Sequence, residues 1–335
     1  MPKPCKAATK PMPKRQRVFL LGATGTIGRA TAAALLAKGH EVVCLVRAKP
    51  DDPRRGLPDG VTLRFGDVTD PASLERDGFV GERFDALVSC LASRTGTPKD
   101  AWAIDHRAHV DALRIAKAVG VSHVVLLSAI CVQRPLLAFQ QAKLAFESEL
   151  TASGLTYSIV RATAFFKSLS GQVARVQAGK PFLLFGDGNL TACKPISDAD
   201  LGTYLAECLD DPTRQNRILP IGGPGPAITP KEQGAALFTL LNQTPKYRSV
   251  PVGFLDGIIA VLSLLGKLSP TLREKAELAR IGRYYATESM LVLNPATGRY
   301  DANATPSAGK DRLVDHYASL LRGEMTTDLG EHAIF

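Results

Sequence analysis

The stretch Gly22-Ala23-Thr24-Gly25-Thr26-Ile27-Gly28 decides the fold of this chain. It directly follows an apolar run, 17–21, typical of a buried strand, and it opens a helical pattern that runs to Lys38. Glycines in such a turn let the backbone bend sharply and approach a pyrophosphate, whose charge is favoured at a helix N-terminus. The spacing is weak evidence alone, but its place between strand and helix strengthens it. We therefore expect the pyrophosphate to lie against Gly22, Thr24, Gly25, Thr26, Ile27 and Gly28.

The first 160 residues alternate short apolar runs with helical periods, a pattern typical of a parallel sheet with crossover helices. The expected strands are 17–21, 41–46, 62–65, 86–90, 123–128 and 157–160. The expected helices are 27–38, 72–77, 100–119 and 136–153. Later elements are a strand at 192–196, a helix capped by Ser197, a strand at 217–221 and a helix at 229–241.

This order predicts an α/β fold, with a Rossmann-like doubly wound parallel sheet and a smaller C-terminal substrate lobe. The expected parts are a disordered basic arm at 1–16, an NADP-binding domain at 17–161, and a smaller substrate-binding lobe at 162–335, interleaved with the domain before it.

The end of the second strand indicates the cofactor. Arg47 lies about 20 residues after the glycines, where an acidic residue would bind the ribose of NAD and an arginine accommodates the 2′-phosphate of NADP. Arg29 adds positive charge beside it. We predict that the cofactor is NADPH, with Asp67 and Val68 near its adenine ring. Cys90, at the end of the fourth strand, is expected to lie beside the cofactor.

The net charge of +9 does not indicate nucleic-acid binding. Residues 1–17 hold six Lys and Arg and no acidic residue, so the rest of the chain is close to balanced. The proline-rich arm is expected to be disordered, and an excess charge confined to a tail excludes a DNA-binding face. A peripheral membrane contact of the arm stays open.

The cysteine spacing and the hydropathy of the chain bear on metal binding, on the redox environment and on membrane spans. Six cysteines form no C-x-x-C pair and no Cys/His cluster, so we expect no metal site and a reducing, cytoplasmic environment. A secretory signal is not expected, although the acid-free arm leaves a transit peptide open. The longest apolar run, 257–266, is too short to span a bilayer and is expected to be a buried core helix. A pocket wall or a shallow membrane contact are its alternatives.

Ser128, Phe139 and Lys143 occupy the positions of a catalytic triad in which one member is changed. Short-chain dehydrogenases carry Tyr-x-x-x-Lys here, and this chain reads Phe139-Gln140-Gln141-Ala142-Lys143. Lys143 is expected to orient the nicotinamide ribose. Ser128, at the end of a strand, is expected either to lie near the nicotinamide or to have a structural role alone. Phenylalanine cannot donate the proton that carbonyl reduction needs. The chain therefore either reduces another acceptor or binds the cofactor without catalysis.

A carbon–carbon double bond conjugated to a large π-system is an acceptor that tolerates this loss. Hydride added at its terminal carbon leaves negative charge spread through the π-system, so no single atom demands an immediate proton. Water or another side chain can supply that proton afterwards. The candidate side chains are Tyr157, Tyr204, Tyr284 and Tyr285, and their spacing does not choose among them.

Residues 123–132, 134–147 and 284–298 resemble the NADPH-dependent divinyl chlorophyllide 8-vinyl reductases, which are atypical short-chain dehydrogenases. The resemblance runs from about Arg17 to Gly323. It implies reduction of the 8-vinyl group of divinyl chlorophyllide a, or of divinyl protochlorophyllide a, to ethyl in chlorophyll or bacteriochlorophyll biosynthesis. It also implies that Phe139 lines the nicotinamide pocket and that Glu288-Ser289-Met290 either borders the substrate or forms a structural turn. Photosynthetic membranes would lie nearby, in a chloroplast if the source is eukaryotic.

Two other function classes stay open. One is an isoflavone-reductase-like enzyme that reduces another conjugated alkene with NADPH. The other is a non-catalytic NADP-binding sensor or complex subunit of the same fold. The missing tyrosine favours the second class, and the retained Lys143 weighs against it.

Overall fold

The computed structural model describes residues 15–49, 51, 52 and 54–325. Most of the arm predicted at 1–16 therefore lies outside the described residues. Gln16 is described, and its carbonyl accepts a hydrogen bond from the Glu41 N–H at 2.9 Å. Regular pairing with the sheet thus begins one residue before the first strand.

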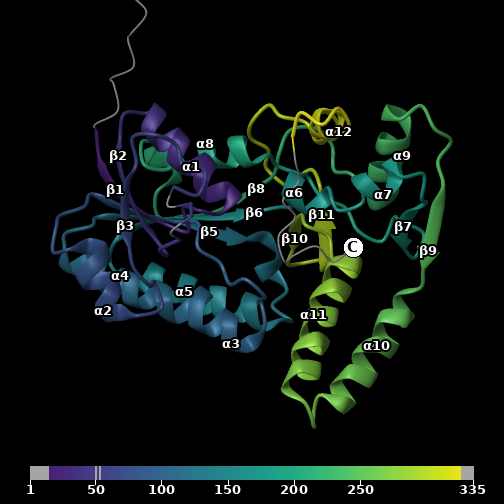
Figure 1. Ribbon diagram of the computed structural model, residues 1–335, viewed down its shortest axis with the longest axis horizontal. Helices are drawn as coiled ribbons and strands as arrows, with labels where there is room; N and C mark the ends of the chain where they lie inside the picture. The colour runs from purple at the N-terminus through teal and green to yellow at the C-terminus, as the bar shows by residue number, and fades with distance from the viewer. Residues whose placement is uncertain (1–14, 50, 53, 326–335) are drawn as a thin grey trace, which may run out of the picture.

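Seven parallel strands form the central sheet in the order β3-β2-β1-β4-β5-β6-β8 (Figure 1). Their bounds are β1 Arg17–Leu21, β2 Glu41–Val46, β3 Thr62–Phe65, β4 Ala86–Ser89, β5 His123–Ala129, β6 Thr156–Ala162 and β8 Arg217–Ile221. The winding reverses between β1 and β4, and open α/β sheets bind ligands in the crevice at such a point, outside the carboxyl ends of their strands. The predicted doubly wound sheet is confirmed.

Helices cover both faces of this sheet (Figure 1). One face carries α1 Thr26–Ala37 and α8 Asp198–Glu207. The other carries α2 Pro71–Ser73, α3 Pro98–Ala101, α4 His109–Ala118 and α5 Ala138–Ala152, with π-helical turns at Leu74–Phe79 and Trp102–Ala108. Strand residues alternate between the layers, since Val18 and Leu20 pack toward α1 while Phe19 and Leu21 pack toward α4 and α5.

The second half of the chain builds a separate apolar cluster and also contributes to the sheet. Its elements are α6 Phe166–Leu169, α7 Val173–Gln177, β7 Phe182–Phe185, α9 Pro230–Leu240, β9 Tyr247–Val250, β10 Val292–Asn294, β11 Arg299–Asp301 and α12 Leu313–Leu321. The cluster is formed mainly by α7, β7, α9 and α12. Since β8 and α8 join the first layers instead, the two halves share one sheet, and the division near residue 161 stays a prediction.

The predicted strand at 192–196 is wrong. Only isolated bridges occur there, at Cys193 and Ile196. Pro195 lies inside the run and has no N–H to donate to a ladder, which explains why no strand forms. The cap predicted just beyond is correct, because the Ser197 hydroxyl accepts a hydrogen bond from the Asp200 N–H at 3.0 Å.

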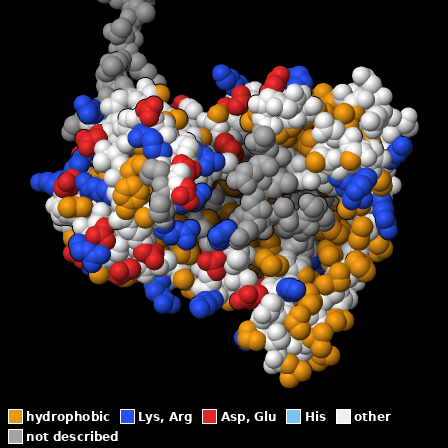
Figure 2. All heavy atoms as spheres, viewed as in Figure 1, with side chains coloured by type: hydrophobic (Ala, Val, Ile, Leu, Met, Phe, Trp, Pro, Cys, Tyr) orange, Lys and Arg blue, Asp and Glu red, His pale blue; other side chains and the backbone are white. Residues whose placement is uncertain are grey.

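Helices α10 Val252–Leu265 and α11 Pro270–Thr287 form a hairpin that projects from the rest of the molecule (Figure 1). The expectation of a buried core helix at 257–266 is wrong, because none of the 14 residues of α10, all of them described, is buried. Apolar side chains gather along this hairpin on the face in view (Figure 2). Among the described helices, none is long and apolar enough to cross a membrane.

Candidate functional site

The glycine loop joins β1 to α1 at the crevice of the sheet. A Cβ atom at Gly22, which has φ +72°, would lie 2.5 Å from the Cys90 carbonyl carbon. A Cβ atom at Gly28 would lie 2.1 Å from the Gly22 oxygen, so both positions require glycine. At Gly25 a Cβ atom would meet only the Gly22 oxygen, at 3.5 Å, which leaves the space in front of the loop open.

The first turn of α1 is prepared for an anion. Gly25 is its N-cap, and within this fully described helix no side chain caps the turn and no acidic residue lies in it. The first N–H groups of a helix have no partner within the helix, and they favour negative charge. The Gly25 N–H donates to the Gly22 oxygen at 3.2 Å, so the N–H groups of Thr26 and Ile27 are the ones that would hold a pyrophosphate here.

Arg29 fastens the glycine loop to the segment after β2. Its Nη1 donates to the Thr24 oxygen at 2.8 Å and to the Arg55 oxygen at 3.4 Å. Asp198 on α8 lies close by; burial raises the pKa of this carboxyl, while Lys167 and Arg29 oppose that rise. Two cations and one partly buried carboxyl thus lie near the loop.

Arg47 and Asp67 face each other across the ends of β2 and β3. The pKa of Asp67 is lowered chiefly by hydrogen bonds from Thr69, whose N–H and hydroxyl donate at 2.8 and 2.7 Å, and further by the charge of Arg47. Arg47 is exposed directly after β2, and Val68 packs on the core beneath. The residues expected around the adenosine end therefore lie together, and their cofactor contacts stay predictions.

Cys90 forms a wall behind the loop. Its Sγ lies 3.5 Å from the Thr31 hydroxyl, and burial raises the pKa of the thiol to about 12. It therefore stays neutral at physiological pH, and it serves here as packing rather than as a nucleophile.

Lys143 is held by a buried carboxylate. Its Nζ donates to Asp105 Oδ1 at 2.9 Å, and the same oxygen accepts the Ser93 N–H at 3.1 Å. Asp105 Oδ2 is buried and has no hydrogen-bond partner among the described residues. The bond to Asp105 uses one of the three ammonium protons, so two remain for ribose hydroxyls, and that predicted role stays a prediction.

Ser128 belongs to a buried polar network under α5. Its hydroxyl donates to Glu147 Oε1 at 2.5 Å, and Arg161 donates to Glu147 Oε2 from Nη2 at 2.5 Å and from Nε at 3.2 Å. This network gives Ser128 a structural role. Its expected place near the nicotinamide stays a prediction.

Phe139 is 8% exposed and lies in an apolar cluster with Cys131, Tyr284 and Met290. A Cβ atom at Gly96 would lie 3.4 Å from the Phe139 ring and 3.1 Å from Ile281 Cδ1. The loop after β4 and helix α11 therefore close on this ring. The sequence named Tyr284 and Tyr285 of this helix as candidate proton donors, but no local pattern placed α11 against Phe139.

Two of the stretches that carried the family resemblance meet here. Glu288 accepts hydrogen bonds from Arg134 Nη1 at 2.8 Å and from the Tyr300 hydroxyl at 2.6 Å. Ser289 Oγ accepts the Ala192 N–H at 3.0 Å. The structure therefore favours the structural-turn interpretation of residues 288–290, which fasten the end of α11 to the segment before α5 and to Ala192.

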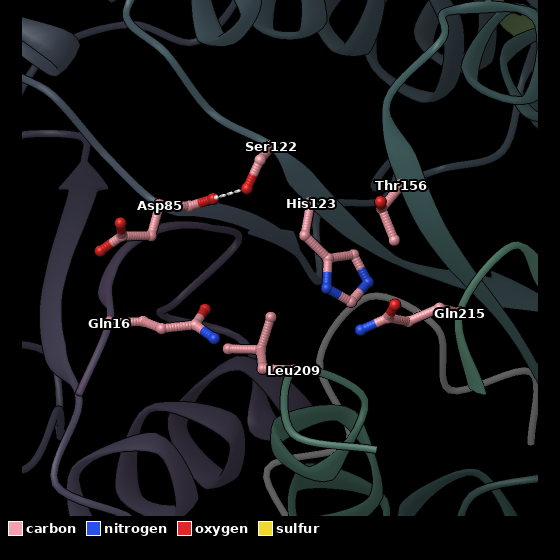
Figure 3. Close-up of a pocket in the computed structure, with 7 residues that line it drawn as sticks. All are labelled: Gln16, Asp85, Ser122, His123, Thr156, Leu209 and Gln215. Carbon is pink, nitrogen blue, oxygen red and sulfur yellow. Dashed lines mark hydrogen bonds between the residues drawn. The ribbon is translucent and has the colours of Figure 1, made fainter. Parts of the chain in front are cut away.

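A second pocket lies at the amino edge of the sheet (Figure 3). It is lined by Gln16, Asp85, Ser122, His123, Thr156, Leu209 and Gln215. The Ser122 hydroxyl donates to the Asp85 oxygen at 3.2 Å, and burial lowers the pKa of His123 to about 4. Open α/β sheets bind ligands at the carboxyl edge, so we do not assign this pocket to the cofactor.

The fold and the loop define a dinucleotide-binding protein of the atypical short-chain dehydrogenase class. Residues 22–212 match the family described as NAD(P)H-binding. The Escherichia coli NADPH-dependent quinone oxidoreductase, solved with NADPH, has a TM-score of 0.63 at 17% identity over 90% of this chain and 99% of its own. That likeness shows a shared fold.

Sequence relatives narrow the class. The chloroplastic divinyl chlorophyllide a 8-vinyl-reductase of Zea mays is 49% identical over 331 residues, 95% of this chain and 82% of the maize protein. The protein of the same name from Arabidopsis thaliana is 47% identical over 334 residues, 95% of this chain and 80% of its own. The chain belongs to the divinyl chlorophyllide a 8-vinyl-reductase family, as its resemblance predicted.

Proposed function

We propose that this chain reduces the 8-vinyl group of divinyl chlorophyllide a to an ethyl group with NADPH, a step of chlorophyll biosynthesis. The identity of 49% to the maize reductase over nearly the whole chain carries the proposal. Divinyl protochlorophyllide a, which carries the same vinyl group, is the alternative substrate.

Different residues of the crevice would bind different parts of the cofactor. When bound, the cofactor supplies the hydride. The first N–H groups of α1 hold the pyrophosphate, and Arg47 together with Arg29 provides positive charge for the 2′-phosphate of NADPH. Lys143, fixed by Asp105, orients the ribose through hydrogen bonds. These assignments are part of the proposal.

Phe139 and its apolar neighbours form the substrate side of the site. An apolar wall suits a flat tetrapyrrole, because binding there buries the apolar face of the macrocycle and excludes water from the site. It offers no phenol at position 139, and a vinyl acceptor conjugated to a macrocycle does not need one there. The composition of this wall therefore supports reduction of a carbon–carbon double bond rather than a carbonyl.

The test is a reduction assay with purified protein, NADPH and divinyl chlorophyllide a, in which the monovinyl product is separated by chromatography. Parallel reactions contain NADH, divinyl protochlorophyllide a, or an isoflavone. Monovinyl product formed with NADPH is expected. NADPH binding without any reduced tetrapyrrole would contradict the proposal and support a non-catalytic role.

We also propose that the α10–α11 hairpin lies on an anionic lipid surface. Leu264 is 64% and Leu268 89% exposed at its tip, beside the exposed cations Lys267, Arg273 and Lys275. Exposed apolar side chains bordered by cations favour shallow insertion among anionic lipids, and each basic residue near the surface contributes about 1 kcal/mol. The chloroplastic names of the maize and Arabidopsis relatives are compatible with a photosynthetic membrane.

Cosedimentation with vesicles tests this contact. The full chain should bind vesicles that contain anionic lipid more strongly than neutral ones, and Leu264→Asp with Leu268→Asp should abolish binding. Leu136→Asp, at an exposed leucine outside the hairpin, is the matched control and should bind normally. A hairpin variant that keeps its vesicle binding but loses self-association on a sizing column would assign the surface to a second copy instead.

A further inference from the structure

A pocket of about 280 Å³ lies between α10 and α11, close to the turn that joins them. On each side, its lining residues recur at intervals of three or four positions, so they share the face that meets the other helix. They are Arg273, Ala276, Glu277 and Arg280 on α11, and Ser263, Gly266 and Lys267 from the end of α10 and the turn after it. The pocket is therefore part of the seam between two helices.

Small residues keep the two helices close together at this pocket. Gly266 is buried, and a Cβ atom there would lie 2.8 Å from the Leu262 oxygen and 3.0 Å from the N and Cα atoms of Arg273. Ala276, which is 1% exposed, also lines the pocket. The place of Arg273 relative to α10 is therefore set by backbone contact and not only by its flexible side chain.

The pocket has an excess of positive charge. Arg280 is neutralised within the wall, because its Nη1 pairs with Glu277 and its Nη2 donates to the Ser263 hydroxyl at 2.7 Å. Neither Lys267 nor Arg273 has an ion pair or a side-chain hydrogen bond with another residue that the structure describes. Two positive charges are therefore available to an anionic ligand.

These two cations suit a phosphate better than a carboxylate. A guanidinium forms two parallel hydrogen bonds to neighbouring phosphate oxygens, and an ammonium acts as a point charge that can take another phosphate oxygen. A carboxylate has only two oxygens, so a bidentate bond to the guanidinium leaves it less able to bind the ammonium as well. Arg273 and Lys267 together therefore favour a phosphate group.

The position of the pocket favours a phospholipid over a soluble phosphate. The hairpin projects from the molecule, and apolar side chains gather along it (Figure 1, Figure 2). Leu264 and Leu268 directly follow two of the lining residues and are 64% and 89% exposed. A lipid with its phosphate in the pocket can bury apolar surface against these leucines, and a free phosphate cannot.

We propose that this pocket binds the phosphate of an anionic phospholipid headgroup, an inference that rests on the lipid contact proposed above. Arg273 and Lys267 hold the phosphate oxygens, and Leu264 and Leu268 lie among the acyl chains. The hairpin then recognises the chemistry of one headgroup in addition to responding to the total charge of the surface.

Vesicles of equal surface charge separate a phosphate site from general attraction. The neutral background is digalactosyl diacylglycerol, which has no phosphate. The anionic lipid is either phosphatidylglycerol or the carboxylate lipid dioleoylglycerol succinate, at the same mole fraction and at a pH where both are ionised. In cosedimentation, the full chain should bind the phosphatidylglycerol vesicles about 10-fold more tightly than the carboxylate vesicles.

Paired variants separate the pocket from net charge. Lys267→Ala with Arg273→Ala should lower binding to phosphatidylglycerol vesicles to the level of the carboxylate vesicles. Lys275→Ala with Arg248→Ala removes the same charge from exposed residues outside the pocket, and it should lower binding to both kinds of vesicle alike. Gly266→Ala changes no charge but displaces Arg273, so it should also remove the preference for phosphate. Circular dichroism checks that each variant stays helical.

Soluble ligands test the source of the phosphate. Short-chain phosphatidylglycerol below its micelle concentration should broaden its phosphorus NMR signal on binding, and glycerol 3-phosphate should not. Equal binding of the two would overturn the lipid assignment.

Two results with vesicles would overturn the pocket. One is equal affinity of the unmodified chain for the two anionic vesicles, and the other is an unchanged preference in Lys267→Ala with Arg273→Ala. If the alanine variants do not fold, Arg273→Lys replaces them, since it keeps the charge without the guanidinium fork, and an unchanged preference there would count against the pocket as well. Absence of binding to either anionic vesicle would instead refute the proposed lipid contact.

Discussion

Phe139 occupies a position where the chemistry of a reductase normally places a hydroxyl, and its surroundings have adapted to the ring. The side chain packs among apolar residues from α3, α5 and α11. A hydroxyl buried without a hydrogen bond costs about 1–3 kcal/mol in proteins. The site is therefore built around a ring without a proton.

This packing makes Phe139→Tyr a test of the acceptor. We expect the variant to have no more activity than the unmodified chain and to unfold at a lower temperature, because the added hydroxyl enters an apolar cluster. Initial rates with divinyl chlorophyllide a and a thermal melt measure both effects. A strong rise in kcat would mean that an acid was wanted at position 139.

Arg47 determines the cofactor in our proposal, and its exposure at the end of β2 makes it a clean target. Arg47→Ala should weaken NADPH binding by about 10-fold or more and NADH binding much less, since only NADPH carries the 2′-phosphate. Titration of both nucleotides gives the two values of Kd. Arg76→Ala removes an exposed arginine paired with Asp77 and serves as the control for net charge. Equal losses for both nucleotides would refute the assignment.

At the scale of elements, helix α5 joins the site to the sheet through one face. Phe139, Lys143 and Glu147 follow one another at intervals of four residues, so they lie on the same side of the helix. The first contacts α11, the second pairs with Asp105 and the third with Arg161. One helix thus positions an apolar wall, a cation and a structural anchor.

Glu147→Ala should destabilise the protein by about 3 kcal/mol, because it removes a buried carboxylate and leaves Arg161, whose side chain is only 17% exposed, without that partner. Urea unfolding followed by circular dichroism measures the change. Glu149→Ala is matched to it on the same helix: Glu149 is 44% exposed and pairs with His106, so a loss of about 1 kcal/mol or less is expected. Similar values for the two variants would contradict a structural role for the buried network.

The elements that the sequence predicted well are those with strong local signals. Strands β1, β2, β3 and β8 have the predicted bounds, because short apolar runs bordered by turn residues leave few alternatives. The prediction of a buried helix at 257–266 failed, because apolar side chains on every face of a helix do not reveal how much of it other elements will cover. Likewise, the pairing of Lys143 with Asp105 and the hydrogen bond from the Tyr284 hydroxyl to the Cys131 oxygen join residues far apart in the chain, which no local pattern reveals.

At the scale of the whole molecule, buried histidines couple stability to pH. Burial lowers the pKa of His109 and of His123 to about 4, from an ordinary 6.5, and those of His40 and His316 shift the same way. The unfolded chain therefore binds protons first as the pH falls. Stability is complete above about pH 6.5 and is lost toward pH 4.

His109 and His123 should each change the free energy of unfolding by about 1.4 kcal/mol per pH unit within that window. Urea unfolding at pH 7.5, 6 and 5 measures the slope. His123→Gln should flatten it by the share of one proton, and replacement of the exposed Arg76 should leave it unchanged. A free energy of unfolding that does not fall between pH 6 and 5 would contradict the assignment of neutral, buried histidines.

The late position of β8 and α8 in the sequence affects how the chain folds while it is being synthesised. β8 pairs with β6 and becomes the outer strand of the sheet, and α8 packs so closely on α1 that a Cβ atom at Gly202 would lie 2.6 Å from the Ala30 carbonyl carbon. Both elements are synthesised after residue 197, long after the glycine loop has left the ribosome. Until then, β6 lacks the strand that later pairs with it and the apolar face of α1 is uncovered, features that promote aggregation. A fragment that ends near residue 161 would keep both defects permanently, so we expect it to need a chaperone.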